Sequence, residues 1–212
     1  MSDRGPGLEL ELEDESSTLW AATLDRVARD LLNAAVRCFA ANGYHATTTR
    51  DISTGAGLSP AAMYVHFPSK ELVLFEIVRS AHERALACVQ DPAIERAPTA
   101  AEGLRLLVSG YTAWHARHHV AARVAQYELA ALAPDHYAEV HGFRQATTDV
   151  FRRAVSRGVQ DGSFAQFDVS PVVRGILSLS IDLVRWYRLD DTDSPEQLGA
   201  LYADLALKMV SR

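Results

Sequence analysis

The helical spacing of apolar residues constrains this chain more than any other feature of its sequence. Between about Thr23 and Asn42 the apolar side chains recur every three or four positions and form one stripe, made of Val27, Leu31, Ala34, Ala35, Cys38 and Phe39. Gly43 follows at the position where helices commonly end in a left-handed residue. No stretch shows the sustained period-two alternation, bounded by hairpin turns, that is typical of half-buried strands. The spacing therefore predicts an all-α fold.

Signals for helix starts and stops divide the rest of the chain at regular intervals. Thr99 and Glu102 form a capping box for a helix that reaches about His118, and Ser69 precedes an apolar run to about Gln90. Further starts, each with proline in the first turn, are predicted at Pro134, Ser170-Pro171 and Ser194-Pro195. Gly158 and Gly162 mark the end of the helix that begins near Pro134. These signals predict about nine helices in all.

The composition narrows the class of protein. The chain has 212 residues, of which 48% are apolar and 23% charged, and this balance excludes a largely disordered chain. No apolar run approaches the roughly 20 residues that span a bilayer, and the chain opens with acidic residues where a secretory signal is basic. Cys38 and Cys88 lie far apart and form no CxxC pair. We therefore expect a cytoplasmic protein with no membrane partner, no metal and no cofactor.

The net charge of −6 is concentrated at the N-terminus. Residues 1–20 carry six acidic side chains and one arginine, whereas residues 21–80 carry six basic and five acidic side chains. Charge is best judged segment by segment, and this distribution permits a nucleic-acid partner without pointing to one.

The most informative segment runs from Tyr44 to Glu71. Thr48 and Asp51 predict the start of a short helix that ends at Gly57, and Ser59 and Pro60 predict a second that stops before proline 68. Two helices of about two turns joined by a tight glycine turn form a helix-turn-helix, which places its second helix in the major groove of DNA.

The second short helix is predicted to have one buried and one outward face. Ile52, Leu58, Met63 and Phe67 are expected to pack on the first long helix, with small Ala56 allowing the helices to approach closely. The outward face then carries Pro60, Ala61, Tyr64 and Val65, with Ser59 and His66 beside it. Valine and tyrosine are unusual choices for bulk solvent, so we expect this face to meet a partner.

The segment closely resembles the DNA-binding domain of the TetR/AcrR family of bacterial regulators. The resemblance covers roughly residues 24–80 and rests on many positions in one register: Phe39, Gly43-Tyr44, Ala46-Thr47-Thr48, Arg50-Asp51-Ile52-Ser53, Ala56-Gly57-Leu58-Ser59, Met63-Tyr64-Val65-His66-Phe67 and Ser69-Lys70-Glu71. Departures from the family pattern are mild, with Ser53 for alanine, Ala61 for a frequent glycine and Met63 for leucine.

The resemblance implies a role for each matched position toward double-stranded operator DNA. Thr48 and Thr49 would bind phosphate oxygens. Side chains at the groove edge would hold the backbone, with a phosphate contact from the next helix: Ser59, Tyr64, His66 and Lys70. Pro60, Ala61 and Val65 would face base edges and, having no side-chain donors, would favour thymine methyl groups. Arg50 is then the best candidate for a hydrogen bond to guanine.

Each of these residues also has a purely structural interpretation. The alternative for Tyr64 is packing on the first helix, and that for Arg50 is a solvated charge. The threonines are expected to be helix caps whether or not DNA is bound. A helical protein-interaction module that does not bind DNA is the main alternative function.

The resemblance implies that the remainder of the chain forms a larger helical domain for dimerisation and effector binding. The last two helices are the natural homodimer interface, and the candidates are Val173, Ile176, Leu177, Val184, Leu198, Leu201, Leu205 and Met209. An intrachain core is the alternative interpretation of these residues. The expected organisation is an acidic leader over residues 1–20, a helix-turn-helix domain over 21–67, and an effector-binding and dimerisation domain over 68–212.

The segment from Ile181 to Arg188 is similar to actinobacterial regulators of sterol and fatty-acid breakdown within the family. This similarity implies a small hydrophobic effector such as an acyl-CoA thioester, and such a ligand needs an apolar cavity with a few polar groups. The candidate ligand-binding residues are Trp114, His118, Arg123, Tyr127, Tyr137, Phe143, Phe151, Arg174 and Ser180. Aromatic side chains at helical spacing are also typical of an ordinary core.

The sequence does not favour an enzyme or a metal site. His115, His118 and His119 are close in sequence, but no cysteine or carboxylate stands at a matching spacing. No GxSxG elbow or glycine-rich phosphate loop is present. We therefore expect a homodimeric transcriptional repressor released by its ligand, while a ligand that increases DNA affinity remains an open alternative.

Overall fold

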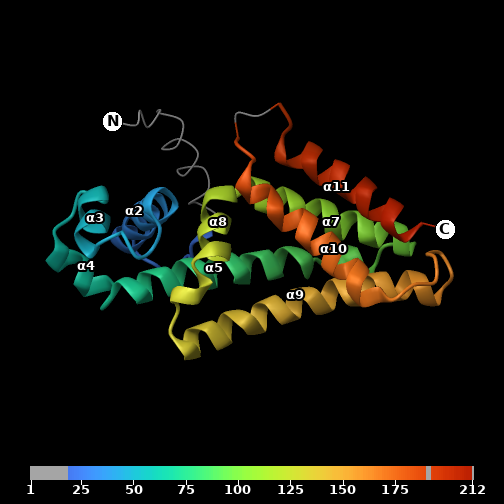
Figure 1. The fold of residues 1–212 in the computed structure, drawn as a ribbon, viewed down its shortest axis with the longest axis horizontal. Coiled ribbons are helices and arrows are strands. Elements are labelled where there is room, and N and C mark those ends of the chain that lie inside the picture. Colours follow the sequence, from blue (N-terminus) through green and yellow to red (C-terminus); the bar gives the residue numbers. More distant parts are fainter. Residues whose placement is uncertain (1–18, 190–191, 212) are drawn as a thin grey trace. The chain divides into compact units, whose positions relative to one another are not determined.

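The computed structural model describes residues 19–189 and 192–211, which form helices joined by turns and contain no strand. The all-α prediction is confirmed for this part of the chain. The chain divides into two compact units (Figure 1): residues up to His82 with Val120–Val140, and Glu83–His119 with residues from His141 onward. Helices α5 (Lys70–Val89) and α9 (Pro134–Gln160) contribute residues to both units.

The first unit contains the predicted helix-turn-helix. Its helices are α2 (Arg26–Asn42), α3 (Thr49–Gly55), α4 (Pro60–His66), the first part of α5, α8 (His119–Tyr127) from its second residue, the 3-10 turn η1 (Leu129–Ala131) and the start of α9. One face of α2 is completely buried, including Leu31, Leu32 and Val36, and Phe39 is nearly so. Of the stripe predicted for this helix, Leu31, Ala34, Ala35 and Phe39 are buried, whereas Val27 and Cys38 are half-buried.

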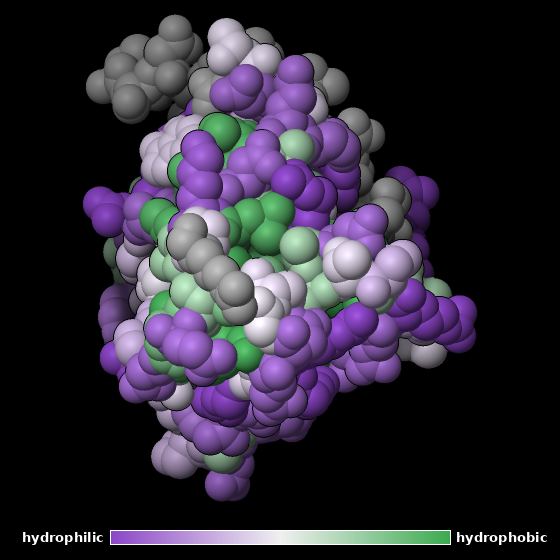
Figure 2. Space-filling model, turned by 90° about the vertical axis from the view of Figure 1, so that its right-hand side faces the viewer, coloured by the Kyte–Doolittle hydropathy of each residue, from purple (hydrophilic) through white to green (hydrophobic). Residues whose placement is uncertain are grey.

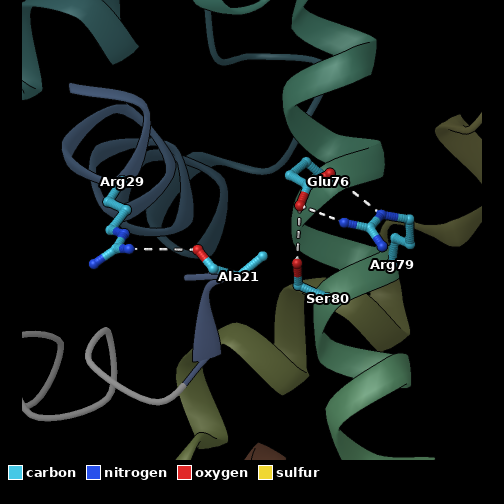
Figure 3. Close-up of polar contacts among 5 residues, drawn as sticks. All are labelled: Ala21, Arg29, Glu76, Arg79 and Ser80. Carbon is cyan, nitrogen blue, oxygen red and sulfur yellow. Dashed lines mark hydrogen bonds and ion pairs between the residues drawn. The ribbon is translucent and has the colours of Figure 1, made fainter. Parts of the chain in front are cut away.

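The residues just before α2 are packed against that helix. Leu19 and Trp20 are buried, and the Trp20 indole N–H donates to Asn33 Oδ1 at 2.7 Å. The Arg29 guanidinium donates to the carbonyl oxygen of Ala21 at 3.5 Å (Figure 3). It also donates to the carbonyl oxygen of Ala22 at 3.0 Å. The predicted leader extends to residue 20, yet its last two residues belong to the packed structure, and residues 1–18 lie outside the described part.

The second unit contains α6 (Pro92–Glu95), α7 (Ala100–Arg117), most of α9, α10 (Val169–Asp182), the 3-10 turn η2 (Leu183–Arg185) and α11 (Pro195–Val210). Helices α7 and α11 pack closely side by side. Gly199 permits this approach, because a Cβ atom there would lie 2.5 Å from the carbonyl oxygen of Ser109. Arg105 and Asp204 form an ion pair between the same two helices at 2.6 Å.

Most helix ends lie where the capping signals predict them. The capping boxes at Thr99 and Glu102 and at Thr48 and Asp51 are both present, and Ser194 caps α11 with Pro195 in the first turn. Helix α10 differs, since it begins at residue 169 and the carboxylate of residue 168 caps it, two residues before the predicted start. Aspartate is as good a cap as serine, and proline is tolerated anywhere in the first turn, so both registers satisfy the local rules.

None of the helices in residues 19–189 and 192–211 combines the length and the apolar character needed to cross a membrane.

Candidate nucleic-acid interface

Helices α3 and α4 are held at a tight turn by local hydrogen bonds. The Thr48 side chain and the Asp51 carboxylate cap the start of α3 reciprocally, with the Thr48 N–H donating to Asp51 Oδ2 at 2.8 Å. Gly57 has a φ of 69°, in the left-handed region that a glycine adopts without strain. The Ser59 hydroxyl oxygen then accepts the Ala62 N–H at 3.2 Å and caps α4. The turn therefore has a defined geometry.

The inner faces of α3 and α4 anchor them to the first unit. Ile52 and Met63 are fully buried, and Phe67 is buried at the end of α4. Leu58, which we expected in the same core, is half-buried. Packing and caps together make this hairpin a rigid platform for whatever its outer face contacts.

The outer face of α4 is apolar and exposed. Val65 is 80% exposed and Tyr64 50% exposed, and Pro60 and Ala61 are exposed beside them. The structure thus brings together on one surface the four residues that the helical spacing assigned to it. This exposed apolar surface would gain free energy if a partner covered it.

The polar groups beside this face have partners within the protein. The Tyr64 hydroxyl lies 3.4 Å from Thr49 Oγ1, which links α4 to α3. His66 Nδ1 lies 3.4 Å from the carboxylate of Asp25, the residue that caps α2. These contacts orient the two side chains along the edge of the hairpin.

Helix α3 carries an exposed arginine, and the threonine that caps the helix is hydrogen-bonded to Asp51. Arg50 is exposed and makes no ion pair with another described residue, so its guanidinium is available to a partner. Thr48 is exposed but its hydroxyl donates to Asp51 Oδ2 at 2.7 Å. The two hydrogen bonds from Thr48 hold the pKa of the Asp51 carboxyl below its ordinary value.

Lys70, which we predicted to contact a phosphate, has hydrogen-bond partners within the first unit. Its ammonium donates to the carbonyl oxygens of Tyr44 and Thr47, at 2.8 and 2.6 Å, and lies 4.2 Å from the centre of the Tyr44 ring. Two of its three protons are therefore used within the first unit. The side chain ties α5 to the loop that leads into α3.

Glu71, for which the sequence predicted only a place in the family motif, links the start of α5 to the start of α9. Its carboxylate accepts the Ala133 N–H at 2.9 Å and a hydrogen bond from His136 Nδ1 at 2.8 Å. The His136 ring stacks on Phe75 with centroids 3.8 Å apart. Further along α5, Glu76 Oε1 accepts from Arg79 and from Ser80, at 2.7 and 3.1 Å (Figure 3). Partners more than 60 residues away give no local sequence signal.

The predicted ligand-binding residues fall into the two units. Trp114, His118, Phe151 and Ser180 are buried in the second unit, with half-buried Phe143 and exposed Arg174. Arg123, Tyr127 and Tyr137 belong to the first unit, and both tyrosines are largely exposed.

The buried group in the second unit is an aromatic cluster. The Trp114 ring lies 5.0 Å from His118, and Tyr111 lies 5.2 Å from Phe151. Burial, with the nearby Arg117 and His119, lowers the pKa of His118 to about 4, so the imidazole is neutral at pH 7. Burial likewise raises the pKa of Tyr111 above its ordinary value.

Two buried hydroxyl groups in this unit lack hydrogen-bond partners among the described residues, those of Thr112 and Ser180. Thr112 was not among the predicted residues, because a threonine on a buried helix face gives no distinguishing signal. A separate surface hollow of about 440 Å³ lies along α9 and is lined by polar residues: His141, Arg144, Gln145, Thr148, Asp149 and Arg152. Within the described part, no group of three or more His, Cys, Asp or Glu side chains is arranged to hold a metal ion.

The residues predicted for the dimer interface differ in their exposure to solvent. Val173, Ile176, Val184 and Leu198 are buried within the single chain, so they form its own core. Large apolar side chains remain exposed on α10, directly after η2 and on α11. They are Leu179, Trp186, Leu201, Leu205 and Met209. Figure 2 looks at the side on which Figure 1 labels the C-terminus, and apolar surface (green) lies there among hydrophilic side chains (purple).

Comparisons with known proteins place both parts of the chain in one family. Residues 31–77 match the family described as "Bacterial regulatory proteins, tetR family", and residues 97–210 match "Tetracyclin repressor-like, C-terminal domain". The transcriptional repressor KstR2 of Mycolicibacterium smegmatis is 32% identical over 185 residues, which cover 84% of this chain and 87% of that protein.

Solved structures agree with these matches. A regulatory protein of the tetR family from Rhodococcus RHA1 is 38% identical, with a TM-score of 0.82 over 89% of this chain and 98% of its own. The ketosteroid transcriptional regulator KstR2 of Mycobacterium tuberculosis is 27% identical, with a TM-score of 0.81 over 91% and 98%.

Proposed function

Because this chain belongs to the tetR family of bacterial regulatory proteins, a family of DNA-binding transcriptional repressors, we propose that it represses transcription as a ligand-released homodimer. The observation that carries the proposal is the outer face of α4. It combines 80% exposure of Val65 with a backbone fixed by two caps and a buried anchor. A rigid, exposed second helix is what a helix-turn-helix inserts into the major groove.

The DNA contacts we propose follow from the positions of the side chains. Thr49 and Thr48 lie at the start of α3 and contact phosphates, and Ser59, Tyr64 and His66 hold the backbone along the edge of α4. Pro60, Ala61 and Val65 meet base edges, and the exposed Arg50 hydrogen-bonds a guanine. Lys70 acts by positioning the loop before α3, given its two carbonyl partners.

We propose that the exposed apolar side chains of α10 and α11 form the homodimer interface. Leu179, Leu201, Leu205 and Met209 are supported by their exposure in the single chain. Leu177, another predicted interface residue on α10, is half-buried. A dimer reads two half-sites about 34–36 Å apart and gains affinity because both heads bind at once.

The proposed effector is small and hydrophobic and binds in the second unit. The support is the buried aromatic cluster around Trp114 and Phe151 together with the hydroxyl groups of Thr112 and Ser180, for which a ligand would supply hydrogen-bond partners. The name of the related ketosteroid regulator and the resemblance of residues 181–188 to lipid-responsive regulators suggest a sterol-derived or fatty acyl-CoA thioester. Arg174, exposed on α10, is available to an anionic group of such a ligand.

Release from DNA requires the effector to prefer a conformation that cannot bind the operator. Shifting a repressor from 1:99 to 99:1 between two states takes about 5.5 kcal/mol of differential affinity. We propose α5 as the element that carries the change, because its residues belong to both units.

The deciding experiment is selection of bound fragments from a genomic library by the purified full chain, followed by titration at several salt concentrations. The proposal expects one or a few enriched sequences and an affinity that falls steeply as salt rises, because Lys and Arg release counterions from phosphates. Val65→Glu places a carboxylate on the binding face and is expected to abolish selection. Leu106→Glu, exposed on α7, is the matched control and is expected to leave selection unchanged. Binding that is weak, unselective and insensitive to Val65→Glu would contradict the proposal.

A further inference from the structure

The chemistry of the outer face of α4 specifies which feature of a base it can recognise. Three of the four outward residues, Pro60, Ala61 and Val65, have no hydrogen-bonding group in their side chains. The fourth, Tyr64, has its hydroxyl 3.4 Å from Thr49 Oγ1, at the α3 edge of the hairpin. Direct readout by donor and acceptor patterns is therefore not available to the centre of this helix.

The polar residues that flank the helix are also engaged. Ser59 accepts the Ala62 N–H at 3.2 Å, and His66 Nδ1 lies 3.4 Å from the Asp25 carboxylate. Their remaining hydrogen-bonding capacity lies at the two ends of α4, where the phosphate backbone would pass if the helix lay in the groove. The middle of the helix is left with methyl and methylene groups, and Val65 is the most exposed of them at 80%.

Only one feature of the major-groove edge of a base pair is apolar, and that is the methyl group at C5 of thymine. A valine side chain that meets this group buries apolar surface on both partners, whereas it leaves the donors and acceptors of other base edges without partners. Ala61 is small enough to let α4 approach the base edges closely. The surface is thus matched to methyl groups at the C5 position of pyrimidines.

We propose that α4 reads C5-methyl groups, so that the operator half-site carries thymines opposite Val65 and Ala61 and that 5-methylcytosine can replace thymine there. The second part follows because the two bases share the C5-methyl group and differ at position 4, where thymine has an oxygen acceptor and cytosine an amino donor. Apolar side chains do not hydrogen-bond either group. The inference rests on the proposed function, and it makes the DNA affinity of this regulator sensitive to methylation of cytosine at C5.

The test uses the selected operator as a duplex and the purified full chain. At each thymine of the protected half-site, four duplexes carry thymine, uracil, cytosine or 5-methylcytosine with the matching partner base. At the thymine that α4 meets, we expect thymine and 5-methylcytosine to bind about fourfold more tightly than uracil and cytosine, the effect of one buried methyl group.

A variant assigns the effect to one side chain. Val65→Ala is expected to abolish the difference between thymine and uracil at one position and to retain it elsewhere, and its exposure means that folding is unaffected. Leu106→Ala, on α7, is expected to keep the wild-type pattern. Equal binding of thymine and uracil at every position overturns the inference while leaving operator binding intact. A chain that selects no DNA at all would instead overturn the proposed function.

Discussion

At the scale of single residues, the exposed Arg50 is the side chain on which sequence preference is expected to depend most. Arg50 is the second residue of α3 and has no ion-pair partner among the described residues. Its guanidinium is therefore able to donate hydrogen bonds to a guanine. We expect Arg50→Ala to reduce the difference in binding free energy between the operator and a scrambled duplex by about 1–3 kcal/mol, measured by titration of both duplexes. An equal loss on the two duplexes would assign Arg50 to a phosphate instead.

His118 gives the protein a pH-dependent stability. Its pKa is lowered to about 4 by burial, so the folded state resists protonation while the unfolded state takes up a proton below about 6.5. The buried neutral imidazole therefore costs no stability above pH 6.5, and the free energy of unfolding decreases as the pH falls from 6.5 toward 4. We expect about 2 kcal/mol less stability at pH 5 than at pH 8 from this group. Urea unfolding of His118→Gln should show a smaller loss over this range, and an unchanged pH profile would contradict the assignment.

At the scale of elements, the start of α5 is the junction of the first unit. Lys70 contacts the loop before α3, and the next residue, Glu71, contacts the turn before α9. Two neighbouring side chains thus link segments that lie about 25 and 60 residues away in the chain.

A phosphate contact by Lys70 and a positioning role for Lys70 predict different salt dependences of the DNA affinity. A phosphate contact contributes about 0.9 to the slope of log affinity against log salt, whereas a positioning residue contributes nothing to it. We expect Lys70→Met to weaken binding to all duplexes and to lower the melting temperature, with the salt slope unchanged. Arg153→Met, exposed on α9, is the control that should change neither quantity. A salt slope reduced by about 0.9, the effect of losing one phosphate contact, would show instead that Lys70 contacts the DNA backbone directly.

At the scale of the whole molecule, two half-sites need two copies of the chain. Leu201 and Leu205 are exposed on α11, so changing both to glutamate would remove the proposed apolar contacts between copies without disturbing the core of either. We expect Leu201→Glu with Leu205→Glu to sediment as a folded monomer and to lose about two orders of magnitude in operator affinity. Val65→Glu should remain a dimer. A dimer that survives the double change places the interface elsewhere.

The sequence by itself determined the features that depend on residues a few positions apart. The capping box at Thr48 and Asp51, the glycine turn at residue 57 and the α4 cap at Ser59 are all local, and each lies where it was predicted. Helical spacing likewise identified the outward face of α4, because residues three and four apart share one side of a helix.

Only the tertiary structure decided which apolar faces are covered and which charges are engaged. Val173 and Ile176 satisfy the same spacing whether they face a partner or their own chain, and their burial here assigns them to the core. Lys70 matches a family motif in sequence, yet its carbonyl partners are Tyr44 and Thr47, which lie 26 and 23 positions earlier in the chain. Hydrophobic burial and hydrogen bonds between distant segments are set by packing, which a local pattern does not encode.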